Sequence, residues 1–475
     1  MNLRGKTVLV LGMGETGLSM VKWLACLGAN VRAADSRAAP PNLDALKQVV
    51  PAAQVFTGTF AAEAFVGIDL IAISPGVPLA EPLVQQAVKR GVPVLGDIEL
   101  FVLALRQISS SKPKILAITG SNGKTTVTAM VGAMVKRAGW DVEVAGNIGP
   151  AALDALMQRE STGRLPQSWV LEISSFQLET TRSLNPDAAV VLNLCEDHFD
   201  RYSGMKDYAA AKARIFLGEA GGSGGGIQIL NRDDPLVCAM ALPGRKQITF
   251  GLNAPVADSD FGLLRDGGDT WLAQGSMRLM KASELAIAGQ HNAANALAAL
   301  ALCRAVGLPF EPLLQALREF KGLPHRMEKV AMFSGVTFYD DSKGTNVGAT
   351  VAALSGMTQS VVLIAGGDGK RQDFSPLRQP IAECARAVVL IGRDAEKIVA
   401  ALDGCGVPLH HAATMEEAVQ QSFALALEGD AVLMSPACAS LDMFRNYAHR
   451  AEVFVAAVRD LETKIQATNH QGLSQ

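Results

Sequence analysis

The chain has 475 residues, 49% of them hydrophobic, and a formal net charge of -3. This length is too great for one hydrophobic core and suggests about three domains. The charged residues of both signs are mixed and leave no basic footprint, which argues against nucleic acid as the main partner.

Cysteine usage and hydropathy point to a cytoplasmic protein. The seven cysteines are scattered and contain no CxxC pair, so we expect reduced thiols rather than a disulfide framework or a zinc site. We expect no signal peptide, because the apolar N-terminal run already reads as a strand followed by a glycine turn. The most apolar later stretch, residues 293–308, contains Asn295 and Arg304 and is shorter than the ~20 apolar residues that cross a bilayer. We therefore expect no membrane insertion.

The first unit has the pattern of a nucleotide-binding α/β fold. Residues 7–11 (TVLVL) predict a buried strand, and residues 12–17 (GMGETG) match GxGxxG at the start of a helix over 18–27. A second strand over 30–34 ends at Asp35-Ser36-Arg37. The spacing and the acidic residue at the tip of the second strand fit a Rossmann-type unit. A tight strand-to-helix turn that binds no ligand is the alternative.

Two loops of this unit are candidates for nucleotide contacts. We expect Asp35 to accept hydrogen bonds from a ribose or base and Arg37 to meet a phosphate. A strand over 69–73 precedes residues 74–78 (SPGVP), whose turn-forming residues suggest another loop that faces the ligand. Residues 109–113 (SSSKP) have linker composition, so the domain is expected to end there.

Residues 114–139 carry the strongest functional signal. Residues 114–119 (KILAIT) predict a strand, Gly120-Ser121-Asn122-Gly123 interrupts it, and Lys124 opens a helix. Backbone N–H groups of such a turn converge on phosphate oxygens, while the helix dipole and the lysine add positive charge. A strict P-loop has a glycine where Ile118 stands, so Gly120 makes the turn instead. The alternative is an ordinary turn with a lysine by chance, but the order of strand, turn, GKT and helix favours a nucleoside-triphosphate site.

The middle of the chain adds more strand ends to this turn. A strand over 169–173 contains Glu172, and another over 188–194 leads into residues 195–200 (CEDHFD). Parallel strands end at one edge of a sheet, so these loops are expected beside the phosphate turn. Residues 221–226 (GGSGGG) suggest a flexible surface loop, and residues 289–292 lead into an alanine-rich helix.

The last part of the chain, from about Leu323, predicts a third alternating α/β sheet. We expect its strands over residues 336–339, 361–365, 387–391 and 431–434. Their polar loops cover residues 340–346, 366–370 and 435–442. The polar tail after about Lys464 is expected to fray. The predicted fold class is therefore α/β with three domains: a Rossmann-like N-terminal domain (1–110), a central P-loop ATPase-like domain (111–322) and a C-terminal Rossmann-like domain (323–475).

Three functions are compatible with two nucleotide-type turns on one chain. A dehydrogenase would bind NAD at GxGxxG. An ATP-driven enzyme would hold a nucleotide-bearing substrate on its first domain. A nucleotide-dependent switch is disfavoured, because no switch-type DxxG follows a strand and a switch would not need the polar loops of the last domain.

A set of motifs in all three domains, in order along the chain, resembles the Mur ligases of peptidoglycan synthesis. They are TGSNGKTT (119–126), LEISSFQLE (171–179), EDHFDRY (196–202), GQHNAANALAA (289–299), LPHRME (323–328), DDSKGTNVGAT (340–350), GGDGK (366–370) and SPACASLDMF (435–444). The pattern is most similar to the members that add D-glutamate. Lys343 stands where sister ligases and the related folylpolyglutamate synthases usually carry a histidine-containing motif.

The resemblance implies an ATP-dependent amide ligase. The carboxylate of UDP-N-acetylmuramoyl-L-alanine would attack the γ-phosphorus of ATP, and the amine of D-glutamate would then displace phosphate from the acyl phosphate. It also implies two Mg²⁺ sites, a lysine carbamylated by CO₂ and cytoplasmic activity as a monomer.

Site residues carry over by motif. The resemblance gives catalytic roles to Lys124, His198 and Lys212, the last as the carbamylated lysine. It implies metal contacts by Thr125, Glu172, His198 and the Lys212 carbamate. It implies ATP contacts by Gly120, Ser121, Asn122, Gly123, Lys124, Thr125, Thr126, Asn292, Asn295, Arg326 and Asp341. Contacts to the UDP substrate are implied for Gly14, Glu15, Thr16, Asp35, Ser36, Arg37, Ser74, Pro75, Gly76, Asn147 and His198. D-Glutamate would meet Lys343, Thr345, Lys370, Ser440, Leu441 and Tyr447, where relatives often have phenylalanine at the last position.

Overall fold

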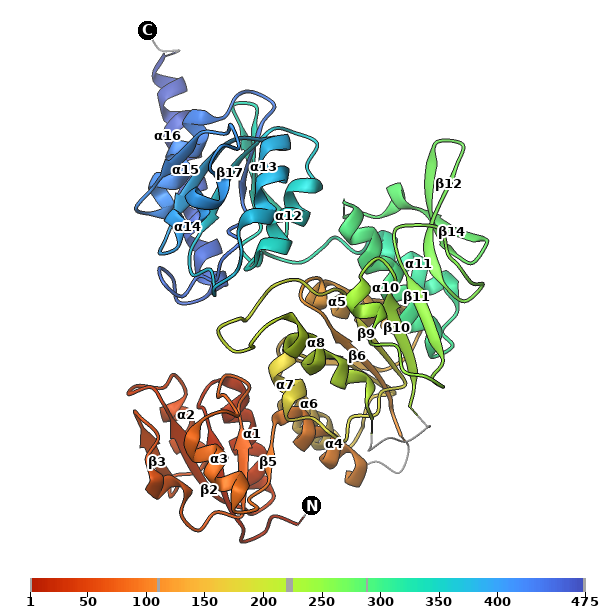
Figure 1. Ribbon diagram of the computed structural model, residues 1–475, viewed down its shortest axis with the longest axis vertical. Coiled ribbons are helices and arrows are strands. Elements are labelled where there is room, and N and C mark those ends of the chain that lie inside the picture. The colour runs from red at the N-terminus through yellow and green to blue at the C-terminus, as the bar shows by residue number, and fades with distance from the viewer. Residues whose placement is uncertain (1, 109–111, 219–224, 288, 473–475) are drawn as a thin grey trace. The chain divides into compact units, whose positions relative to one another are not determined.

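A computed structural model describes residues 2–108, 112–218, 225–287 and 289–472 (Figure 1). The expected linker at 109–113 and the glycine loop at 221–226 lie partly outside these residues. The chain forms two compact units. The first comprises Met1–Leu194, Lys206–Ala282 and Ala294–Arg318, and the second comprises Cys195–Met205, Ser283–Ala293 and Glu319–Gln475.

The N-terminal sheet of the first unit is parallel, with strand order β3-β2-β1-β4-β5. Its strands are β1 (Thr7–Leu11), β2 (Asn30–Asp35), β3 (Gln54–Thr57), β4 (Leu70–Ile73) and β5 (Val94–Leu95). The helices are α1 (Glu15–Cys26), α2 (Leu43–Val49), α3 (Pro82–Lys89) and α4 (Asp97–Ile108). Leu11 pairs with Ala34 on one side and with Ile73 on the other, so the loops after these three strands meet at one edge. This order is that of a Rossmann half, in which ligands bind at the carboxyl ends of the strands.

The second sheet of this unit has nine strands in the order β14-β13-β12-β11-β10-β9-β6-β8-β7. Its parallel core consists of β6 (Lys114–Thr119), β7 (Val142–Gly146), β8 (Ser168–Glu172), β9 (Ala188–Val191), β10 (Ile227–Asn231) and β11 (Gln247–Phe250). An extension of β12 (Phe261–Asp266), β13 (Asp269–Gln274) and β14 (Met277–Lys281) follows, with antiparallel β12–β13 and β13–β14 pairs. The helices are α5 (Lys124–Arg137), α6 (Ala152–Ser161), α7 (Ser175–Glu179), α8 (Met205–Ala213), α9 (Pro235–Cys238), α10 (Gln290–Ala305) and α11 (Phe310–Glu319). β6 lies between β8 and β9, so the turn after β6 has strand ends on both sides.

The sheet of the second unit has the order β15-β16-β20-β17-β18-β19, and only the β15–β16 pair is antiparallel. Its strands are β15 (Glu328–Phe333), β16 (Val336–Asp340), β17 (Val361–Gly366), β18 (Ala385–Ile391), β19 (Leu409–His411) and β20 (Ala431–Met434). The helices are α12 (Val347–Ser355), α13 (Arg378–Cys384), α14 (Ala395–Leu402), α15 (Met415–Leu425) and α16 (Tyr447–Gly472). β17 and β20 are apolar and buried along their whole length, as expected for parallel strands covered on both faces.

The predicted α/β class and three sheets are confirmed, but the expected fraying after Lys464 is wrong. α16 continues to Gly472, coloured blue at the C-terminal end in Figure 1. Lys464 pairs through its Nζ atom with Asp460 one turn earlier at 2.7 Å, and no proline or glycine interrupts this stretch before Gly472. Among the described residues, no helix has both the length and the apolar character needed to cross a bilayer.

Helix α4 belongs by sequence to the first domain but packs on the central one. It contacts α6 and α7, and the ring of Phe101 meets the edge of Trp169 with centroids 4.9 Å apart. The buried carboxylate of Glu99 accepts hydrogen bonds from the backbone N–H groups of Arg182 and Ser183 at 2.6 and 2.9 Å. These contacts join the two sheets of the first unit.

Asp97 makes the same junction sensitive to pH. Its buried carboxylate accepts a hydrogen bond from Gln177 Nε2 at 2.8 Å, yet burial outweighs this bond and raises the pKa of Asp97 to about 6. The folded chain therefore keeps this proton at pH values where the unfolded chain has released it. Its contribution to stability is complete below about pH 4 and is lost as pH rises through about 6.

Replacing Asp97 by asparagine is expected to stabilise the protein at pH 8, because asparagine keeps an acceptor for Gln177 and carries no charge. The gain should be about 1–3 kcal/mol in unfolding free energy and should vanish near pH 4. Thermal unfolding of Asp97→Asn and wild type across this range measures it, with the exposed Asp258→Asn as control. A gain independent of pH would contradict the assignment.

Candidate active site

The turn after β6 has the backbone geometry of an anion-binding loop. Gly120 and Gly123 have φ values of +152° and +82°, in the region where a side chain would be strained. A Cβ atom on Gly120 would lie 2.9 Å from Leu192 Cβ, and one on Gly123 would lie 2.5 Å from Asn295 Oδ1. Both positions therefore require glycine, and the Asn295 side chain lies directly against the turn.

Two lysines converge on this turn. Lys124 Nζ donates to the carbonyl oxygens of Gly120 and Ser121 at 2.9 and 2.8 Å. Lys212 Nζ, on α8, donates to the same Gly120 oxygen at 2.8 Å and is buried. It also lies 4.6 Å from the centre of the Tyr208 ring. Two ammonium groups at one carbonyl favour the approach of an anion.

Asn193, which follows β9, and Tyr208, on α8, form hydrogen bonds with the turn. Asn193 Oδ1 accepts from the Asn122 N–H at 2.8 Å, and its Nδ2 donates to the Asn122 carbonyl at 3.1 Å. The Tyr208 hydroxyl lies 3.2 Å from Ser121 Oγ. Neither residue is among the predicted site residues, although a polar Asn193 at the end of an apolar strand is a signal that indicates such a role.

Glu172 provides an acidic group at the end of β8, next to the phosphate turn. It pairs with Ile118 of β6, and its Oε1 atom accepts from Asn147 Nδ2 at 2.7 Å. Its Oε2 atom is buried and has no hydrogen-bond partner among the described residues. Thr125 stands half-buried in the first turn of α5. A carboxylate oxygen without a partner beside a phosphate-type turn and a hydroxyl fits the oxygen ligands that Mg²⁺ prefers.

A cavity of about 700 Å³ opens where the two sheets of the first unit meet. It contains every residue predicted for the UDP substrate except His198, which belongs to the second unit. It also contains residues that the sequence analysis did not predict: Gly12, Val77, Gly146, Gly149, Pro150, Ala151, Asp154 and Gln177. The predicted loops after β1, β2 and β4 thus share one cavity with the strand end that carries Asn147.

Asp35 and Arg37 form a fixed pair in this cavity. Asp35 accepts from the Met13 N–H at 2.6 Å and from Arg37 Nε and Nη2 at 2.8 and 2.7 Å. Burial raises the pKa of Asp35, but the hydrogen bonds from Arg37 and Met13 outweigh it and lower this pKa to about 2. Asp35 is therefore an anionic acceptor at neutral pH, and the half-exposed Arg37 keeps its charge toward the cavity.

Several of the remaining predicted residues lie on loops after strands of the second unit. Asp341 is buried and accepts from Ser435 Oγ at 2.7 Å. Burial raises its pKa to about 7 against this hydrogen bond and the charge of Arg326. Lys343 places its Nζ atom 3.5 Å from the centre of the Tyr447 ring. Lys343 and Tyr447, both predicted for D-glutamate, are thus brought together.

Two further predicted residues, Lys370 and His198, lie on neighbouring loops of this unit. Lys370 Nζ forms an ion pair with the buried carboxylate of Asp197. Asn346 Nδ2 donates to the same carboxylate at 3.3 Å. His198 has a left-handed φ of +57°, and its N–H donates to Asp197 Oδ1 at 2.9 Å. Thr345 is half-buried on the loop between Lys343 and Asn346, while Asn292 lies in the first turn of α10.

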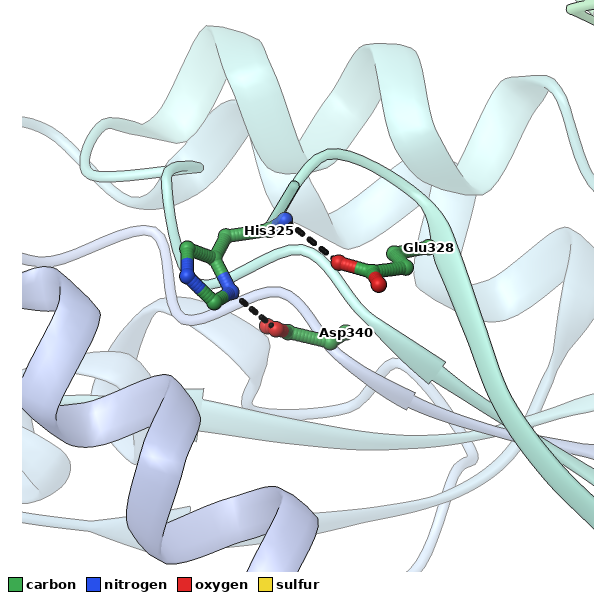
Figure 2. A group of neighbouring side chains, drawn as sticks. All are labelled: His325, Glu328 and Asp340. Atoms are coloured by element: carbon green, nitrogen blue, oxygen red, sulfur yellow. Dashed lines mark hydrogen bonds and ion pairs between the residues drawn. The ribbon is translucent and has the colours of Figure 1, made fainter. Parts of the chain in front are cut away.

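His325, Glu328 and Asp340 form a small hydrogen-bonded cluster in the second unit (Figure 2). His325 Nδ1 lies 2.7 Å from the buried Asp340 carboxylate, and the His325 N–H donates to Glu328 at 2.9 Å. The His325 carbonyl accepts from the Lys343 N–H at 3.2 Å. His325 and Asp340 are not among the predicted site residues, although they lie within the LPHRME and DDSKGTNVGAT motifs. On the loop after β20, Ser440 is buried and Leu441 is exposed.

Fold and site together define a class: enzymes with three α/β sheets, a phosphate-type turn in the central one and a nucleotide-type cavity beside it. Three family models match the chain in the same order. They describe a Mur ligase MurD-like N-terminal domain (residues 6–96), a Mur ligase middle domain (118–303) and a Mur ligase glutamate ligase domain (325–438).

Relatives match over the whole chain. It is 69% identical to the UDP-N-acetylmuramoylalanine–D-glutamate ligase of Nitrosospira multiformis, covering 100% of this chain and 99% of the relative. Identity to the enzyme of the same name from Nitrosomonas europaea is 66%, covering 98% and 99%. The fold is also similar to the crystal structure of UDP-N-acetylmuramate–alanine ligase from Thermotoga maritima, with TM-score 0.60, 18% identity and coverage of 96% and 99%. The chain belongs to the Mur ligase family.

Replacing Gly123 by alanine is expected to weaken ATP binding about tenfold or more, because the added Cβ atom would displace Asn295. Gly139→Ala is the matched control, since Gly139 has a similar φ of +86° with no atom within 4 Å of an added Cβ. It should lose about 1 kcal/mol of stability and keep its affinity for ATP. Calorimetric titration with MgATP measures both affinities, and an equal loss in the two variants would rule out the contact with Asn295 as the cause.

Proposed function

We propose that this protein is the ATP-dependent ligase that joins D-glutamate to UDP-N-acetylmuramoyl-L-alanine in the cytoplasmic stage of peptidoglycan synthesis. The identity of 69% over the full chain with a ligase of that activity carries the proposal. The paired lysines at the phosphate turn and the cavity between the two sheets of the first unit support it.

The reaction begins with a problem of charge. A substrate carboxylate must approach a triphosphate, and like charges about 4 Å apart repel by about 4 kcal/mol at an effective dielectric of 20. Lys124 and the N–H groups at the start of α5 would offset this repulsion by holding the β- and γ-phosphates of ATP. The carboxylate then attacks the γ-phosphorus and ADP leaves. The amine of D-glutamate attacks the acyl carbon and phosphate leaves.

Metal ions fit the oxygen groups beside the turn. Glu172 and Thr125 would hold one Mg²⁺, and His198 with Lys212 as a carbamate would hold a second. A bound Mg²⁺ supplies positive charge to the phosphate oxygens. An unmodified lysine ammonium has no lone pair for a metal, whereas a carbamate offers two oxygens. Lys212 stands at the turn, so a carbamate on it would offer metal ligands beside the phosphate site.

The remaining assignments rest on the family resemblance of the motifs. The chain would divide into a UDP-binding domain (1–110), an ATP-binding domain (111–322) and an amino-acid-binding domain (323–475), and would act as a monomer. Arg326 would contact the ATP phosphates and Asp341 its ribose, while Asn292 and Asn295 would lie near the adenine. Asn147 and His198 would contact the muramoyl-alanine end of the substrate. Lysines 343 and 370 suit the two carboxylates of D-glutamate.

Incubating the protein with MgATP, UDP-N-acetylmuramoyl-L-alanine and a panel of amino acids tests the proposal. Phosphate release and a product one glutamyl residue heavier are expected with D-glutamate and absent with L-glutamate. Lys124→Ala should reduce turnover about a thousandfold or more, because it removes the charge that holds the phosphates. Normal ligation by this variant, or NAD reduction in place of phosphate release, would refute the assignment.

Replacing Lys212 by alanine is expected to abolish ligation and to leave a space that a short carboxylic acid can fill. Added acetate or formate should restore part of the activity, because either supplies the oxygens of a carbamate. Lys206→Ala is the control, since Lys206 is an exposed lysine of the same helix. Activity of Lys212→Ala equal to wild type without added acid would exclude the carbamate.

A further inference from the structure

Arg450, on α16, is a fully buried cation whose hydrogen bonds go to neutral oxygens. Its exposed fraction is 0%. The Nε and Nη2 atoms donate to Ser342 Oγ and to the Ser342 carbonyl at 3.1 and 2.8 Å, and Nη1 donates to the Cys438 carbonyl at 3.1 Å. One guanidinium therefore bonds the loop after β16 and the loop after β20 at the same time.

The network extends to a third loop and to α16 itself. Ala439 and Asp368 exchange backbone hydrogen bonds of 2.8 and 3.0 Å, which join the loop after β20 to the loop after β17. Ser342 Oγ, which accepts from Arg450, donates to the Tyr447 carbonyl at 2.7 Å. The three loops and the start of α16 carry the residues proposed for D-glutamate: Lys343, Thr345, Lys370, Ser440, Leu441 and Tyr447.

The charge of Arg450 persists in this buried position. Burial lowers its pKa to about 10, while Cys438 and the carboxylates of Asp442, Asp340 and Asp341 act in the opposite direction. The group is therefore still a cation at neutral pH. A buried cation without a directly bonded carboxylate costs stability, and an apolar side chain of similar size would avoid that cost.

We propose that Arg450 is a positioning residue for the amino-acid pocket: its fork of donors holds the loops after β16 and β20 together, and the backbone pair of Ala439 and Asp368 keeps the loop after β17 in the same arrangement, so that the proposed D-glutamate lysines keep their spacing. The inference rests on the proposed function for the identity of the amino acid. A guanidinium suits this role because its donors lie in one plane at fixed angles, whereas a lysine ammonium is a single point of charge on a flexible stem.

The test compares Arg450→Met and Arg450→Lys with wild type in the ligase assay. Both variants should raise KM for D-glutamate at least tenfold and change KM for ATP less than twofold. Arg459→Met is the matched control, because Arg459 is an exposed arginine of the same helix, and it should match wild type. A wild-type KM for D-glutamate in Arg450→Lys would overturn the proposal, since that variant keeps the charge and loses the fork.

Hydrogen–deuterium exchange separates this inference from the proposed function. In Arg450→Met, backbone amides in residues 341–346, 367–370 and 437–442 should exchange faster together, while those of β17 and β20 stay protected. Ser342→Ala, which removes one partner of the fork, should do the same to a smaller degree if the methionine variant does not fold. Unchanged exchange in these loops refutes the positioning role. A wild-type protein that does not ligate D-glutamate refutes the proposed function instead.

Discussion

The carbonyl oxygen of Gly120 is the point on which the central site depends. It accepts hydrogen bonds from Lys124 and Lys212, which reach it from the start of α5 and from α8. In the unmodified chain the two ammonium groups at one oxygen repel each other and favour an anion beside them, whereas the proposed carbamate of Lys212 would remove one of these charges and supply oxygens for a metal. The glycine at this position frees space for the backbone to pass Leu192. Strand order, turn conformation and the two lysines thus combine to make one place where a polyanion is favoured.

In the other two sites, the predicted cations are paired with neighbouring groups of the protein. In the N-terminal cavity Arg37 is paired to Asp35, so the cavity contains a cation with a fixed direction. In the second unit, Lys370 is paired with Asp197 and Lys343 lies over the Tyr447 ring. Arg37, Lys370 and Lys343 therefore each have a partner that sets the direction of the side chain. Such preorganisation lowers the entropy cost of ordering these side chains when a ligand binds.

Local signals in the sequence were sufficient to predict the α/β fold class and the phosphate-type turn after β6. Residues 114–119 and 431–434 are strands with the predicted bounds, because short apolar runs between turn residues have few other solutions. The motifs also located ten of the residues that line the N-terminal cavity, and the other lining residues were not predicted. The antiparallel extension β12–β14 escaped prediction, since its strands are half-polar and lie at the edge of the sheet. The role of Arg450 was not predicted for another reason: a lone arginine in a helix is expected to be exposed until the loops that surround it are known.

The packing of α4 has a consequence for how the protein can be divided and made. Phe101 and Glu99 find their partners on residues that lie roughly seventy to eighty positions later in the chain. A fragment that ended after this helix would present an apolar stripe and an unpaired carboxylate to solvent. On the ribosome, the first sheet would be complete well before its last helix could dock. A shorter fragment ending before Asp97 is therefore the better choice for studying the nucleotide-type cavity wall in isolation.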